Sequence, residues 1–159
     1  MSIAADSRIV LNLIGKVGWL DCIVLISQSG HCPSSNESET TPHMLISCSS
    51  LALVWSELQS FHPLNVDSVK DLLEKLFRQD SLYNVVIIVL WNIWKRKNSK
   101  VSRDVFEELH ITASKIADDL MLWSNRYSNG IKRGLLMDWS TMLYHLSMRF
   151  YFFLPFLFY

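Results

Sequence analysis

The sequence predicts a mainly α-helical fold, a small domain of about five helices with a degenerate zinc-knuckle-like loop between the first two. The chain has 159 residues, half of them apolar, which is enough to bury a core. Apolar side chains recur at steps of three and four along several segments, the period of amphipathic helices. A polar, turn-rich loop near residue 35 separates the first two of these segments.

The first predicted helix runs from about Arg8 to Lys16, with Ser7 as its N-cap. Polar residues interrupt this apolar run, and no cleavage site for a signal peptide stands out, so we expect an intracellular protein, nuclear or cytoplasmic. The chain has three cysteines, an odd number that favours thiols or metal ligands over disulfides. Cys22 is most simply a buried apolar thiol.

The second predicted helix follows the polar loop. Thr41 is a suitable N-cap, Pro42 suits the first helical position, and His62-Pro63 ends the helix. One continuous apolar stripe is predicted along it: Met44, Leu45, Cys48, Leu51, Ala52, Trp55 and Leu58. A third helix is expected from Asp67 or Ser68 to Gln79.

The most apolar internal stretch is LYNVVIIVLWNIW, residues 82–94. Its β-branched run is compatible with a buried strand. Its length, the spacing of Trp91 and Trp94 and the basic residues that follow favour a central helix instead. Thirteen residues are too few to span a bilayer, so no integral membrane insertion is expected.

A fifth helix is predicted near Asp104 to Arg126. Its inward face comprises Phe106, Leu109, Ala113, Ile116, Ala117, Leu120 and Trp123. Ile116-Ala117-Asp118-Asp119 looks like the metal-binding box of a polymerase. Adjacent side chains on a helix diverge by about 100°, so we interpret the two aspartates as a solvated edge. No other motif of an active site is found, and we expect no enzyme.

The chain is predicted to divide into a helical domain, 1–127, and a divergent hydrophobic aromatic tail, 128–159. Gly130 and Gly134 are expected to break the chain, with a short helix from Leu135. The last ten residues, FYFFLPFLFY, include seven aromatic side chains. If exposed, they form an aggregation hazard or an anchor at a membrane surface.

Cys32, His43 and Cys48 are candidate zinc ligands, because thiolates and imidazole on a loop and an adjoining helix commonly build small zinc sites. Ser35 stands where a second thiolate of the loop is expected, and His31 or a water could supply the fourth ligand. The alternative is that Cys48 is a small core residue on the apolar stripe.

A local basic patch follows the central helix: Lys95, Arg96, Lys97, Lys100 and Arg103. The whole chain has fifteen basic and fifteen acidic side chains, so no global charge attracts nucleic acid. The patch can contact at most five phosphates, which corresponds to a salt slope of roughly −3.5 to −4.5. Alternatively, these cations only stabilise a helix C-terminus.

Two signatures resemble a known family, the zinc-binding region of plant non-LTR (LINE-type) retrotransposon reverse transcriptases. The first comprises Cys32-Pro33, Glu39-Thr40, His43, Cys48 and Trp55; the second is Trp91-x2-Trp94-Lys95-Arg96-Lys97-Asn98, with Lys97 where the family usually has Arg. The likeness covers roughly residues 8–127, and the chain departs from the family at Ser35 and in its tail.

The resemblance implies a non-catalytic domain derived from a retroelement, stabilised by zinc and associated with RNA or DNA beside a reverse transcriptase module. The competing hypothesis is a degenerate helical remnant, or a protein-interaction module, that binds neither zinc nor nucleic acid. A third is a peripheral membrane protein that uses the aromatic tail.

Overall fold

The computed structural model describes residues 32, 37, 38, 40, 43–61 and 80–153, and over these residues the protein is mainly α-helical, as predicted. In chain order the elements are a π-helical turn η1 (His43–Ser47), a 3-10 turn η2 (Ser49–Leu51), and the α-helices α3 (Ala52–Phe61), α5 (Asp80–Arg103), α6 (Leu109–Ser124) and α7 (Gly130–Phe153). The helices predicted at 8–16 and about 67–79, and Cys22, lie outside the described residues.

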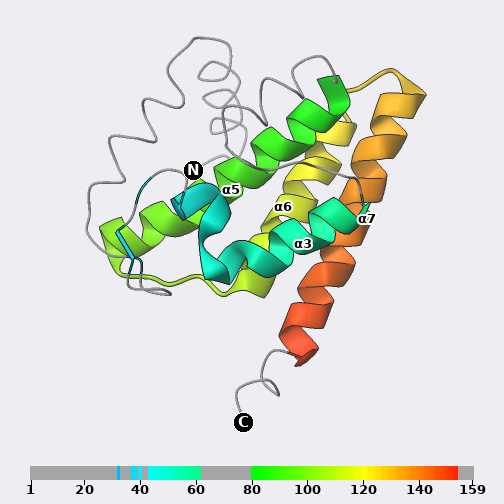
Figure 1. Ribbon diagram of the computed structural model, residues 1–159. Coiled ribbons are helices and arrows are strands. Elements are labelled where there is room, and N and C mark those ends of the chain that lie inside the picture. Colours follow the sequence, from blue (N-terminus) through cyan, green and yellow to red (C-terminus); the bar gives the residue numbers. More distant parts are fainter. Residues whose placement is uncertain (1–31, 33–36, 39, 41–42, 62–79, 154–159) are drawn as a thin grey trace.

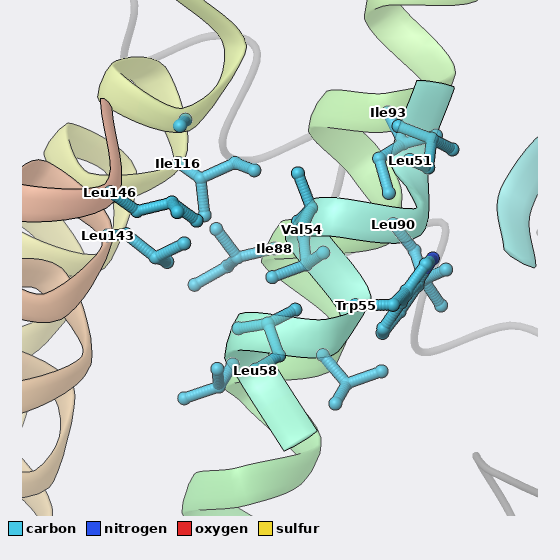
Figure 2. Packing of buried hydrophobic residues seen from close by; sticks show 14 of the residues in the cluster. Leu51, Val54, Trp55, Leu58, Ile88, Leu90, Ile93, Ile116, Leu143 and Leu146 are labelled. Carbon is cyan, nitrogen blue, oxygen red and sulfur yellow. The ribbon is translucent and has the colours of Figure 1, made fainter. Parts of the chain in front are cut away.

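The helices form one hydrophobic core. α6 and α7 lie side by side, and α3 and α5 run across this pair (Figure 1). Figure 2 shows Val54 and Leu58 of α3 meeting Ile88 of α5, and these side chains face apolar residues of α6 and α7. Burying one such side chain fully contributes about 1.5–3 kcal/mol, so the crossing is held by apolar packing.

The segment 82–94 is helical, which confirms the helix over the strand. Its side chains from Val85 to Leu90 are all buried, because α5 is covered by neighbours on several sides. The basic residues form the last turns of the same helix. α5 is therefore apolar in its first half and basic in its second.

The second helix was predicted to be continuous, and this is wrong. The helical path breaks at Cys48, whose backbone is extended (φ −61°, ψ 127°), between η1 and η2. The buried Trp55 indole donates to the Leu45 carbonyl at 3.0 Å, an oxygen that a continuous α-helix would pair with a backbone N–H. The break also changes the stripe, since Ala52 is exposed and Val54 is buried.

The helix predicted from Asp104 begins only at Leu109. Asp104 instead ends α5 in a left-handed conformation (φ 52°), and its N–H donates to the Lys100 carbonyl at 3.0 Å, the pattern of an αL cap. Phe106, predicted to face inward, is 46% exposed because it lies in the connecting segment. Leu109, Ala113, Ile116, Ala117 and Leu120 are buried, as predicted.

The expected short helix from Leu135 is a 24-residue helix that starts at Gly130 and contains Gly134. Asn129 caps it, since its Oδ1 accepts the N–H of Ile131 at 2.9 Å and that of Lys132 at 3.3 Å. One stripe of α7 is buried against α6: Leu136, Trp139, Leu143, Leu146 and Phe150. Residues on both sides of the predicted boundary at 127/128 thus share one core.

Candidate metal centre

Three side chains that the sequence suggests as metal ligands meet at one buried place. Cys32 comes from the loop, His43 opens η1, and Cys48 lies at the break before η2. Their donor atoms all lie within 4.8 Å of one another. The residues are only 3%, 7% and 6% exposed, so an ion held by them would be largely shielded from bulk water.

Backbone hydrogen bonds hold the loop and the helical turn in this arrangement. The N–H of Cys32 donates to the Glu37 carbonyl at 2.8 Å, which closes the loop. The N–H of His43 donates to the Thr40 hydroxyl at 3.3 Å, which ties the start of η1 to Thr40, while Thr41, the predicted N-cap, lies outside the described residues. The break at Cys48 then directs its thiol toward the loop, where the two cysteine Sγ atoms lie 3.5 Å apart.

The geometry of these donors fits zinc. Two sulfurs that each lie ~2.3 Å from a zinc ion at the tetrahedral angle are about 3.8 Å apart, close to the observed 3.5 Å. Two thiols and an imidazole are also the donor types that zinc prefers. The described residues thus offer three of the four ligands of a tetrahedral ion, while His31 and Ser35 lie outside the described residues.

Glu37 supports the imidazole. Its Oε2 lies 3.0 Å from Nδ1 of His43, and its side chain is 68% exposed. A carboxylate on one ring nitrogen fixes the tautomer that presents the other nitrogen, here Nε2, to a metal. Metal-ligating histidines commonly have such a partner, so this contact favours a metal role for His43 over a purely structural one.

Cations adjoin the two thiols. Arg96 donates to the hydroxyl of Ser50 at 3.4 Å, and that hydroxyl lies 3.2 Å from Cys48 Sγ. Burial lowers the pKa of Arg96, while the negative charge of a Cys48 thiolate raises it. Arg96 therefore lies next to the part of the candidate centre that holds Cys48, and Ser50 connects the two side chains.

A hollow borders the cysteines. It is partly open to solvent, and its volume is about 400 Å³ when the adjoining open solvent is included. Cys32, Cys48 and Ser50 line one part of it, and Arg96, Lys97, Lys100 and Phe106 line another. Burial lowers the pKa of Lys97, a Cys32 thiolate raises it, and the charge of Lys100 lowers it.

The five residues of the predicted basic patch have different surroundings. Arg96 donates from Nε to the Glu107 carbonyl at 2.8 Å and stacks on the Phe106 ring at 4.5 Å. This guanidinium therefore tethers the connecting segment to α5. The other four members lie in the C-terminal half of α5. Lys95 pairs with Asp119 at 3.7 Å, and Lys100 pairs with Asp104 at 2.5 Å. Arg103 donates a hydrogen bond to the Ser99 hydroxyl at 2.9 Å, and Lys97 lines the hollow.

The two adjacent aspartates of α6 diverge, as predicted. Asp118 is exposed. Asp119 is not simply solvated, since it accepts a hydrogen bond from buried Asn92 at 2.8 Å. Among the described residues, the pair belongs to no group of three or more side chains that could hold a metal ion.

The supporting residues Glu37, Ser50 and Arg96 were not singled out from the sequence as parts of a metal site. Glu37 lies six positions before His43, and no short motif marks this spacing. Arg96 belongs to the predicted basic patch, but its contact with Ser50 joins segments 46 residues apart. Only the folded arrangement reveals these roles.

Comparison of the chain with protein families, curated proteins and solved structures gives no match. In the part of the chain that the structure describes, no helix is both long and apolar enough to cross a membrane. Fold and site together define a class: a small, mainly α-helical domain with a cluster of cysteine and histidine that could hold a metal ion.

Proposed function

We propose that this protein is a non-catalytic domain whose fold is stabilised by a zinc ion bound to Cys32, His43 and Cys48. The observation that carries the proposal is the convergence of these three buried donors from a loop and a helix break. Two further observations support it. The two sulfur atoms lie 3.5 Å apart, and the Glu37 carboxylate contacts the His43 imidazole.

Zinc at this place would connect the segment that carries Cys32 with the segment that carries Cys48. Cys32 lies in the loop and Cys48 at an irregular break, so an ion between them would close a loop of the unfolded chain. A site absent from the unfolded state converts metal binding into folding free energy. The stabilisation is then RT ln(1 + [Zn]/Kd), about 4 kcal/mol at a thousandfold excess over Kd.

The resemblance to the zinc-binding region of plant retrotransposon reverse transcriptases suggests the biological setting. In this proposal the domain derives from a retroelement and associates with RNA or DNA, as part of a larger assembly with a reverse transcriptase module. The metal is the part of this proposal that the positions of Cys32, His43 and Cys48 support directly, and its test comes first.

The test is the zinc content of purified chain, measured by elemental analysis and accompanied by thermal unfolding with and without chelator. We expect about one zinc per chain, lost in His43→Ala and in Cys48→Ser. His145→Ala is the matched control, because His145 is exposed on α7. It should retain the zinc.

Less than a tenth of an equivalent of zinc in the unaltered chain, after reconstitution under reducing conditions, would refute the proposal. The chain would then be a helical remnant or interaction module that binds no zinc. Equal zinc in the unaltered chain and in both ligand variants would also refute it, since the metal would then be bound elsewhere.

A further inference from the structure

Cys32 and Cys48 form a close pair of sulfur atoms, and this pair allows a second chemistry at the candidate metal centre. The two Sγ atoms lie 3.5 Å apart, and no disulfide joins them in this structure. The S–S bond of a disulfide is about 2.0 Å long, so the sulfurs need to approach each other by roughly 1.5 Å to form one. The fold therefore brings them within a short movement of a covalent bond.

The proximity of the two cysteines is a property of the fold. They are 16 positions apart in the sequence and lie on either side of η1. Backbone hydrogen bonds hold both ends of the pair, since the N–H of Cys32 donates to the Glu37 carbonyl and the N–H of Cys48 to the His43 carbonyl, each at 2.8 Å. Reaction between groups held in contact is intramolecular, which raises their effective concentration.

The pair is buried, but a small molecule has a route to it. Cys32 is 3% exposed and Cys48 is 6% exposed. Both residues line the hollow, however, and the hollow is partly open to solvent. A small reagent that enters the hollow can therefore reach a sulfur that the outer surface of the protein does not present.

We propose that Cys32 and Cys48 are a redox modification site, which a small-molecule disulfide oxidises to a Cys32–Cys48 disulfide. In the first exchange, one cysteine sulfur bonds to a sulfur of the reagent, whose S–S bond breaks and releases one thiol. In the second exchange, the other cysteine sulfur displaces the remaining half of the reagent, and the Cys32–Cys48 bond forms. Two electrons and two protons pass from the cysteines to the reagent, which leaves as two thiols.

The disulfide also controls the metal. Zinc is bound by the thiolate form of cysteine, and an oxidised pair has no thiolate. Of the three candidate ligands, His43 alone then remains. Oxidation therefore releases the metal, and bound metal protects the cysteines. This control of the metal rests on the proposed function, whereas the disulfide itself requires no metal.

The test treats the full chain, from which metal has been removed under reducing conditions, with the small neutral reagent bis(2-hydroxyethyl) disulfide. Remaining thiols are alkylated, and the digested chain is analysed by mass spectrometry. We expect a Cys32–Cys48 linkage in most chains, reversed by dithiothreitol. A chain loaded with zinc should form the linkage about tenfold more slowly, because its sulfurs are bound to the metal. The oxidised chain should bind no zinc.

Cys22 provides the matched control, because it separates reaction in the folded chain from reaction in an unfolded one. Cys22 is nearer to Cys32 in the sequence than Cys48 is, and a shorter loop closes more readily in an unfolded chain. Random closure therefore favours Cys22–Cys32, whereas the contact in the fold favours Cys32–Cys48. Cys22→Ser should leave the Cys32–Cys48 linkage unchanged, and concentrated urea should abolish the preference for it.

The results distinguish this inference from the proposed function. Mixed disulfides with the reagent at both cysteines, a linkage to Cys22, or the same preference in urea would overturn the modification site while the metal site stands. An oxidised chain that binds as much zinc as the reduced chain would overturn the control of the metal. A reduced chain that binds no zinc would refute the proposed function and that control, whereas a Cys32–Cys48 linkage in the same chain would still support the modification site.

Discussion

Trp55→Phe tests the structural reason for the break at Cys48. The Trp55 indole N–H donates to the Leu45 carbonyl at 3.0 Å, and both residues are at most 4% exposed. Phenylalanine retains an aromatic ring but has no donor. The substitution therefore leaves the Leu45 carbonyl without this hydrogen bond in a place that water reaches poorly.

The size of the effect follows from two contributions. Leaving a buried acceptor unsatisfied costs about 1–3 kcal/mol, and the smaller ring adds a packing loss on the order of 1 kcal/mol. The free energy of unfolding should fall by about 2–4 kcal/mol. For a chain of this size, each kcal/mol corresponds to roughly 2–4 °C in Tm, so we expect a shift of about 5–15 °C.

The assay is urea unfolding followed by far-ultraviolet circular dichroism, with Trp123→Phe as the control. Trp123 is half-buried on α6, and its replacement should cost less than about 1 kcal/mol. Because the hydrogen bond supports the break that positions Cys48, Trp55→Phe should also weaken metal binding. A loss of stability no larger than that of the control would refute this account of the break.

Two further predictions concern α7 and the basic end of α5. Replacing the N-cap in Asn129→Ala should lower the free energy of unfolding by about 1 kcal/mol, and Asn129→Ser should restore most of it; urea unfolding measures both, and equal losses would contradict the capping role. The second prediction concerns the binding of nucleic acid. Arg96 donates hydrogen bonds to Ser50 and to the Glu107 carbonyl, so at most four cations of the basic patch remain to contact phosphates. Binding of a single-stranded oligonucleotide should then show a salt slope no steeper than roughly −2.8, and a slope near −5 would refute this limit.

The helices follow from the sequence where one face is strongly apolar. The run around Val89 is long and continuous, so its helix is predictable, and the buried positions of α6 follow from their spacing. The break at Cys48 is not predictable in this way. It depends on a hydrogen bond between Trp55 and Leu45, and on packing that buries Val54 in place of Ala52.

The ends of helices are predicted less well, since they depend on caps. From the sequence, Asp104 is predicted to begin a helix, because acidic residues stabilise helix N-termini. In the structure it ends the preceding helix, where a left-handed residue is required. Asn129 was missed because Gly130 and Gly134 suggested a break; the buried stripe of α7, with Trp139 at its centre, outweighs the low helix propensity of glycine.

The candidate metal ligands are visible in the sequence because cysteine and histidine carry a recognisable chemistry. The hollow is not, since Lys97 and Phe106 reach it from different segments. Glu37 is likewise an ordinary acidic residue until the fold brings it to Nδ1 of His43. The parts of a site that act through distance and charge require the folded chain.

The two halves of α5 have a mechanical consequence. A helix of 24 residues is a stiff rod about 36 Å long, and its first half is clamped in the core by side chains such as Ile88 and Leu90. The cations at its other end therefore have little freedom to shift as a group. Any adjustment to the radius of an ion held by the candidate ligands would then fall to the segments that carry Cys32 and Cys48, neither of which lies in a helix.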